Sequence, residues 1–356
     1  MISIYFDQEF IELFGKRSDL SDPVVFDFFN QFIKKIRGIK IFVNIDSLDE
    51  VKELVMNNEM YSLISEIAPI KLSNFKDQLS NPEFYKDGSI TKLFFVENCD
   101  ENELQRKNNY HFISNKTLTE KWKLFLSDRE DSELIIKSNS QPSEEQVFRS
   151  WADFNFFAHK IKNILVFDFF VMGNKTNQKI EKNLLPCIKE LIKNNKVNVE
   201  DLTIYTKELA NNSKKKKERQ GLWEESDFTL SFKLLESLRT GVNNISFIKY
   251  DESKNIGADS EHNRFILTNY FFIRVEAGLN IFKDNGNVNN RDTIRFDSIF
   301  KNKTRNIVVE ALKNINKYTS QLKEKDDGVI GQGKKLEHYN YFPLLNCPFL
   351  NKSQHP

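Results

Sequence analysis

Three polar side chains in the C-terminal half, His262, Arg264 and Asn269, have the types and spacing needed for phosphate chemistry. They form the pattern H-x-R-x4-N, and the residues around them predict a β-strand. Side chains alternate between the two faces of a strand, so His262 and Arg264 are expected to point to the same face. A guanidinium holds two phosphate oxygens at once, and an imidazole attacks phosphorus or transfers a proton. The sequence therefore predicts a site for phosphate or a phosphodiester here, with a hydrogen-bonded histidine at a strand end as the plainer alternative.

This pattern resembles the H-x-K-x4-D signature of the phospholipase D superfamily, with Arg264 in place of the lysine and Asn269 in place of the aspartate. The longer string H-x-R-F-I-x-T-N, followed by I-x-x-x-x-G-L-x-I-F, is more similar to a divergent branch of that superfamily. This branch includes the C-terminal domain of MIT-domain-containing proteins. The resemblance covers roughly residues 150–315. It implies a phospholipase-D-like α/β domain with His262 at the position of the nucleophile, and it calls for no metal or other cofactor.

The motif also departs from the family in two ways. Active members combine two motifs, whereas this chain has one, because His159 in H-K-I-K has a different spacing. The amide of Asn269 forms hydrogen bonds but carries no charge to pair with an imidazolium. Catalysis would therefore require a homodimer that joins two His262 residues, acting as a metal-independent phosphodiesterase or nuclease. The MIT-associated branch implies the alternative of a non-catalytic module that binds phospholipid or a protein partner, or of an accessory subunit.

A basic run is a second candidate for contact with a polyanion. It comprises Lys214, Lys215, Lys216, Lys217 and Arg219, flanked by Asn and Ser. Such a loop can bind the phosphates of nucleic acid or an anionic lipid surface. The alternative is a solvated loop without a ligand.

Carboxylates in the N-terminal half follow predicted strands: Asp7, Asp46, Glu97 and Asp100. Carboxylates past the ends of parallel strands can converge on Mg²⁺, as in nucleases of the PIN or Toprim type. The plainer interpretation is that loops are polar. A further carboxylate, Asp168, falls inside the predicted strand 164–171, where a charge is costly unless paired. It either lines the site opposite His262 or sits at the strand end, facing solvent or Arg239.

Strands and helices alternate in both halves, which predicts the α/β class with mostly parallel sheets. We expect strands at 2–6, 39–45, 92–97, 110–113, 164–171, 199–206, 245–250, 262–268 and 270–276. We expect helices at 24–37, from 48 onward, 117–127, 147–161, 177–194, 227–240 and 304–318. The predicted organisation is an α/β domain of unknown role (1–135), a linker (136–147), the phospholipase-D-like domain (148–318) and a polar tail (319–356).

The composition limits the class of protein further. The chain has 356 residues with 39% hydrophobic and 29% charged residues, which is typical of a folded protein. Three distant cysteines argue against a disulfide framework or a thiolate zinc site. The formal charge of +1 requires any binding of nucleic acid or lipid to come from a local patch. We expect a cytoplasmic protein of a bacterial phage-defence system. Nucleic acid is the favoured partner, a protein from the same operon is a further candidate, and membrane lipid is less favoured.

Overall fold

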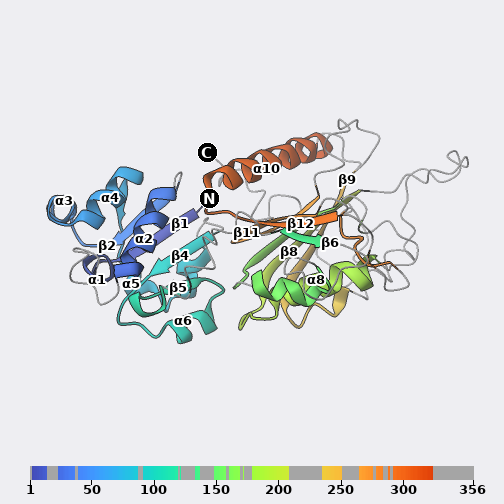
Figure 1. Ribbon diagram of the computed structural model, residues 1–356, viewed down its shortest axis with the longest axis horizontal. Helices are drawn as coiled ribbons and strands as arrows, with labels where there is room; N and C mark the ends of the chain where they lie inside the picture. The colour runs from blue at the N-terminus through green and yellow to red at the C-terminus, as the bar shows by residue number, and fades with distance from the viewer. Residues whose placement is uncertain are drawn as a thin grey trace, which may run out of the picture. The chain divides into compact units, whose positions relative to one another are not determined.

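The structure of this chain is a computed structural model, shown in Figure 1. It describes residues 2–13, 23–36, 39–86, 91–118, 121, 133–136, 148–157, 160–168, 171, 179–207, 235–250, 264–275, 278–283, 288 and 292–323. These residues fall into two compact units. Unit 1 contains residues 1–130 and 298–307 together with 352–356, and unit 2 contains residues 131–297 and 308–351.

Unit 1 is built on a five-stranded parallel sheet in the order β3-β2-β1-β4-β5. Its strands are β1 (Ile2–Asp7), β2 (Lys40–Asn44), β3 (Ile70–Leu72), β4 (Thr91–Phe95) and β5 (His111–Ile113). The chain moves outward from β1 to β3 and then returns to place β4 on the other side of β1. The carboxyl ends of β1 and β4 therefore form the switch point of the topology, where open parallel sheets usually bind ligands.

Aromatic side chains fill both faces of this sheet. On one face, Tyr5 stacks on Phe42 and on Phe94, with ring centroids 4.8 and 4.7 Å apart, and Phe94 stacks on Phe112 at 4.8 Å. On the other face, Phe6 stacks on Phe95 at 4.9 Å. Because neighbouring residues of a strand point to opposite faces, both faces need a helical cover.

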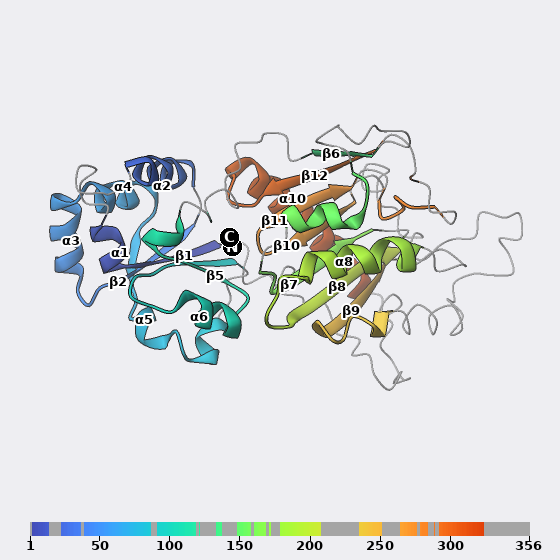
Figure 2. The same ribbon diagram turned by 60° about the horizontal axis from the view of Figure 1, so that its bottom comes forward.

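The helices of unit 1 provide that cover on both sides (Figure 2). They are α1 (Gln8–Glu12), α2 (Pro23–Lys35), α3 (Leu48–Asn57), α4 (Glu59–Ile67), α5 (Phe75–Gln78), the 3-10 helix η2 (Pro82–Lys86) and α6 (Glu101–Lys107). Phe29 of α2 packs edge-on against Phe95, while Phe75 of α5 packs against Tyr5 from the opposite face. Ser47 caps α3 by accepting a hydrogen bond from the amide of Glu50.

Unit 2 contains a seven-stranded sheet in the order β6-β12-β11-β10-β7-β8-β9. Its strands are β6 (Glu133–Ile136), β7 (Asn163–Phe167), β8 (Val199–Lys207), β9 (Val242–Tyr250), β10 (Phe265–Thr268), β11 (Phe271–Val275) and β12 (Asp292–Ser298). Strands β7, β8 and β9 are parallel, but β10 runs antiparallel to both β7 and β11. The expectation of a mostly parallel sheet is correct for unit 1, whereas the sheet of unit 2 is mixed.

The helical elements of unit 2 are the 3-10 helix η3 (Trp151–Phe157), the π-helix η4 (Lys179–Leu184) and α8 (Leu185–Ile192). The buried face of α8 lies against the sheet, near β7 and β8 (Figure 2). Helix α10 (Asn302–Lys323) begins in residues grouped with unit 1 and continues in residues grouped with unit 2. It extends past residue 318, where the sequence predicts a polar tail to have begun.

The division between the units differs in detail from the sequence prediction. Residues 133–136 are expected at the junction of the first domain and the linker, but they form β6, which pairs with β12 in the sheet of unit 2. The sequence pattern predicted neither strand: β6 has only four residues, and β12 contains three charged residues. Among the described residues, no helix has the length and apolar character needed to cross a membrane.

Candidate functional site

Arg264 and Asp168 meet at one edge of the sheet of unit 2. Phe265 pairs with Phe167 in the antiparallel register between β10 and β7. Arg264 directly precedes Phe265, and Asp168 directly follows Phe167, so the two charged residues occupy facing positions just outside the paired strands. This edge is the carboxyl end of the parallel strands β7 and β8, which is the usual side for a ligand in α/β sheets.

Gly278 brings the backbone close to both charged side chains. Its φ of +74° lies in the left-handed region that glycine adopts without strain. A Cβ atom at this position would lie 2.5 Å from Arg264 Cδ, 2.9 Å from Arg264 Nη1 and 2.6 Å from Asp168 Oδ2. The absence of a side chain at Gly278 therefore allows the guanidinium and the carboxylate to pack against the main chain.

Asp168 is held firmly in this position. It is 3% exposed, its amide donates to the carbonyl of Tyr205 at 3.1 Å, and its Oδ2 accepts from the amide of Leu279 at 2.6 Å. A buried carboxylate needs such partners because an unpaired charge is strongly destabilised away from water. Of the two predicted roles of Asp168, the structure supports a place beside the arginine of the motif.

Lys179 adds a second cation to this edge. It begins η4 and is half-buried, and burial lowers the pKa of its ammonium group. The carboxylate of Asp168 opposes this shift in the pKa, and the guanidinium of Arg264 adds to it. Lys179 is therefore close enough to both groups to interact with their charges. The cluster formed by Asp168, Lys179, Arg264 and Gly278 is called the arginine site below.

The other predicted residues of unit 2 fall in two categories. His262 and the basic run Lys214, Lys215, Lys216, Lys217 and Arg219 lie outside the described residues. Asn269 is described, and it lies at the far end of β10 from Arg264. There it is fully buried, and its Oδ1 accepts from the amides of Lys162 and Asn163, each at 2.8 Å.

The structure does not bring Asn269 and Arg264 together. Strand β10 separates them, and five residues of extended chain span roughly 16 Å. The Asn269 amide instead satisfies two backbone donors at the start of β7. A residue that accepts two buried N–H groups has a structural role, whatever its place in a motif.

A second polar cluster lies at the switch point of unit 1. Asp7 ends β1 and is buried, and its Oδ2 is 2.7 Å from Lys76 Nζ. The same oxygen accepts from the amide of Glu97, which follows β4, at 3.2 Å. Glu9 also pairs with Lys76, at 3.2 Å, and accepts from Asn98 Nδ2 at 2.8 Å. We call Asp7, Glu9, Lys76, Glu97 and Asn98 the switch-point cluster.

The electrostatics of this cluster depend on Lys76. Burial alone would lower the pKa of Lys76, but hydrogen bonds to Asp7 and Glu9 and their charges outweigh burial and raise it. Hydrogen bonds from Asn98 and Lys76 lower the pKa of Glu9. Burial raises the pKa of Glu97, and the nearby charge of Asp7 contributes in the same direction.

Only part of the predicted group of carboxylates converges here. Asp7 and Glu97 come together as the parallel strands require, but Asp46 is exposed, and Asp100 caps α6 by accepting from the amide of Glu103 at 3.0 Å. Within the described part of the chain, no three His, Cys, Asp or Glu side chains are grouped to hold a metal ion. The described residues therefore do not by themselves fit the predicted Mg²⁺ site.

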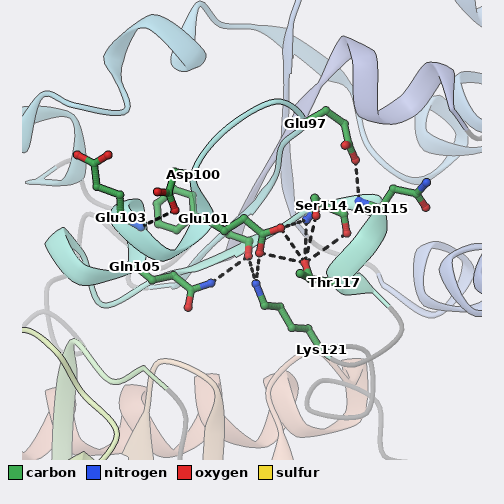
Figure 3. A network of polar contacts seen from close by, with 10 residues as sticks. Glu97, Asp100, Glu101, Glu103, Gln105, Ser114, Asn115, Thr117 and Lys121 are labelled. Carbon is green, nitrogen blue, oxygen red and sulfur yellow. Dashed lines mark hydrogen bonds and ion pairs between the residues drawn. The ribbon is translucent and has the colours of Figure 1, made fainter.

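A network of polar contacts fixes the loops that follow β4 and β5 (Figure 3). Glu97 Oε1 accepts from the amide of Asn115 at 2.6 Å. Glu101 accepts from the amide of Ser114 at 3.0 Å and from the hydroxyl of Thr117 at 2.9 Å, and it forms an ion pair with Lys121. The network ties the segment that carries Glu97 to the next strand, so this side of the switch-point cluster is preorganised.

Sequence reasoning missed the lysines of both sites. Lys76 lies far along the chain from Asp7, and Lys179 lies far from Arg264, and no motif marks either lysine. Gly278 carried a weak signal as the glycine of the G-L-x-I-F string. A scan against protein-family models and a search of curated proteins both find no match for this chain.

Proposed function

We propose that unit 2 binds a phosphodiester at the arginine site, with the backbone of a nucleic acid as its ligand. The observation that carries this proposal is the placement of Arg264, whose half-buried guanidinium packs on the backbone at Gly278 beside the fixed carboxylate of Asp168. A guanidinium held in one orientation loses little freedom when it binds two phosphate oxygens.

Lys179 supports the same function because it adds a second cation at the same edge. Arginine makes directional hydrogen bonds to phosphate, whereas lysine acts as a compact positive charge. Together they suit an anion that arrives at the carboxyl end of β7 and β8. The basic run at 214–219 would add contacts that depend on charge alone, which strengthen binding to any polyanion.

Cleavage of the phosphodiester is an extension of this proposal. His262 lies two residues before Arg264 in the sequence, and its imidazole would supply the nucleophile or the proton. This chemistry needs no metal. Because an active site of this type combines two motifs and each chain has one, cleavage would require a dimer of two chains. Within a phage-defence system, such a protein would act on invading nucleic acid with a partner from the same operon.

Binding is tested with the full chain and labelled single- and double-stranded DNA and RNA over a range of salt concentrations. Arg264→Gln should weaken binding about tenfold or more, because one bidentate contact to phosphate is lost. Lys189→Gln removes an exposed charge from α8 and serves as the matched control. Equal affinities of Arg264→Gln, Lys189→Gln and the wild type would reject the proposal. Anionic vesicles form a parallel arm, and binding to them alone would favour the lipid alternative.

Cleavage is tested on the same substrates with and without EDTA. Metal-independent cleavage should persist in EDTA and disappear in His262→Ala. Gel filtration of the active sample then reports whether the active species is a dimer. Salt-sensitive binding without cleavage would assign a binding module rather than a nuclease.

A second candidate function is hydrolysis of a phosphate ester at the switch-point cluster of unit 1. The observation that favours it is the meeting of Asp7, Lys76 and Glu97 at the point where the strand order reverses. The lysine would hold a phosphate oxygen and the carboxylates would act as nucleophile or base. Asp7→Asn should abolish such hydrolysis, and an effect of EDTA would show whether a cation completes the site.

A further inference from the structure

Asp168 places a fixed negative charge in a site that otherwise presents cations. Its Oδ2 and Arg264 Nη1 both lie within 3 Å of the point where a Cβ on Gly278 would sit. The carboxylate is buried, so solvent ions screen it only weakly. Any anion that binds the guanidinium of Arg264 therefore comes within the field of Asp168.

We propose that Asp168 determines the charge selectivity of the arginine site, which accepts a singly charged phosphodiester and excludes a doubly charged phosphomonoester. This inference rests on the proposed function, because it concerns the same site and its ligand. A phosphodiester carries one negative charge, and a phosphomonoester carries nearly two above its second pKa of about 6. The second negative charge of the phosphomonoester is attracted by the Arg264 guanidinium and repelled by the Asp168 carboxylate. The repulsion therefore offsets the attraction.

The structure also gives Asp168 a positioning role that can be separated from its charge. Its Oδ2 accepts from the amide of Leu279, next to Gly278 in the turn that supports the guanidinium. An asparagine keeps an oxygen in this place and removes the negative charge. Asp168→Asn therefore tests selectivity, whereas Asp168→Ala removes both the charge and the acceptor.

The full chain is titrated with diethyl phosphate and with ethyl phosphate at pH 7.5, and ligand-detected NMR measures the binding of each. The wild type should prefer the diester. Asp168→Asn should bind ethyl phosphate about tenfold more tightly than the wild type, because one like-charge repulsion is removed. The affinity of Asp168→Asn for diethyl phosphate should rise less, so its preference for the diester over the monoester should be smaller than that of the wild type or reversed. Lys189→Gln should leave both affinities unchanged.

The outcomes distinguish failure of this inference from failure of the proposed function. If the wild type binds ethyl phosphate as tightly as diethyl phosphate, Asp168 does not set selectivity, and this holds even if Asp168→Asn fails to fold. If Asp168→Asn weakens both ligands equally while thermal unfolding shows a folded protein, Asp168 acts by positioning alone. If the wild type binds neither ligand and Arg264→Gln leaves nucleic-acid binding unchanged, the proposed function itself is rejected.

Discussion

At the scale of single residues, Gly278 is the position where the backbone of the arginine site is most constrained. We predict that Gly278→Ala lowers the free energy of unfolding by about 2 kcal/mol or more, because a Cβ is strained at a positive φ and collides with Arg264 and Asp168. Urea unfolding measures this change. Phosphodiester binding should weaken in the same variant, since the guanidinium must move.

Gly241→Ala is the matched control for that prediction. Its Cβ would come within 2.8 Å of Ile192 Cδ1, the end of a flexible side chain, and no left-handed φ is involved. Gly241→Ala should lower the free energy of unfolding by much less than Gly278→Ala does. Equal effects of the two substitutions would mean that the positive φ and the contact with Arg264 do not govern the site.

Lys76 provides the second prediction at this scale. Lys76→Met leaves the carboxylate of Asp7 buried without its cation. We expect this change to lower the free energy of unfolding by about 2 kcal/mol. This value is smaller than for a fully buried ion pair, because Lys76 is itself partly exposed. Lys52→Met breaks an ion pair with Asp49 in which both side chains are largely exposed, and it should change stability by less than about 0.5 kcal/mol. Chemical denaturation at pH 7 compares them. An equally small effect at Lys76 would show that the pair with Asp7 is not stabilising.

The individual residues of the sites were predictable to different degrees. Arg264 could be found because its motif combines residue types suited to phosphate at a recognisable spacing in the sequence. Asp7 and Glu97 could be paired because parallel strands share one edge. Lys76 and Lys179 could not be found, since their contacts depend on how a later helix packs, and that is set by tertiary structure. Asn269 matched the motif but serves the backbone of a neighbouring strand.

At the scale of elements, Asn269 joins β10 to the start of β7. We predict that Asn269→Ala lowers the free energy of unfolding by about 2–4 kcal/mol, because two buried amides lose their acceptor. Asn269→Asp keeps an oxygen acceptor and should be less destabilising. Thermal unfolding ranks the stabilities of the wild type, Asn269→Asp and Asn269→Ala. Asn269→Asp should fold and retain phosphodiester binding. Loss of binding with unchanged stability would show that Asn269 contributes to the phosphodiester site.

The parallel strands β7, β8 and β9 carry a polar row in which Asn163, Asp201 and Asn244 pair in register. Burial raises the pKa of Asp201 from 3.8 to about 6, with Glu200 adding to the shift. The folded state then binds this proton more tightly than the unfolded state, so stability should fall as pH rises from about 4 to about 6.

Asp201→Asn should remove this component of the pH dependence. Because Asp201 is partly exposed, the expected gain is about 1 kcal/mol at pH 8, with no gain at pH 4. Urea unfolding at the two pH values measures it. A variant that is less stable at pH 8 would show that the ionised carboxylate is stabilised by its neighbours.

The elements were largely predictable where the sequence pattern is strong. The strands β1, β2, β4, β7, β8 and β9 carry apolar runs or alternation, and the structure places them within a few residues of the predicted ranges. The edge strands β3 and β6 were not predicted, and neither was β12, which lies between β6 and β11. Edge strands gain their stability from one neighbour and tolerate polar residues, so they leave little signal in sequence. The mixed order of unit 2 depends on long-range pairing, which local patterns do not contain.

At the scale of the whole molecule, the net charge of +1 gives no overall attraction to a polyanion, so the two functions that we propose each depend on a local site, one in each unit. We predict that single substitutions separate these sites in the full chain. Arg264→Gln should weaken salt-dependent binding of nucleic acid about tenfold or more and leave any ester hydrolysis by unit 1 intact. Asp7→Asn should do the reverse, with Lys52→Met as the control for both assays. The slope of log affinity against log salt should also fall by about one in Arg264→Gln, because one phosphate contact is lost. Loss of both properties in either variant would show that the two clusters serve one function and would replace the two-site proposal.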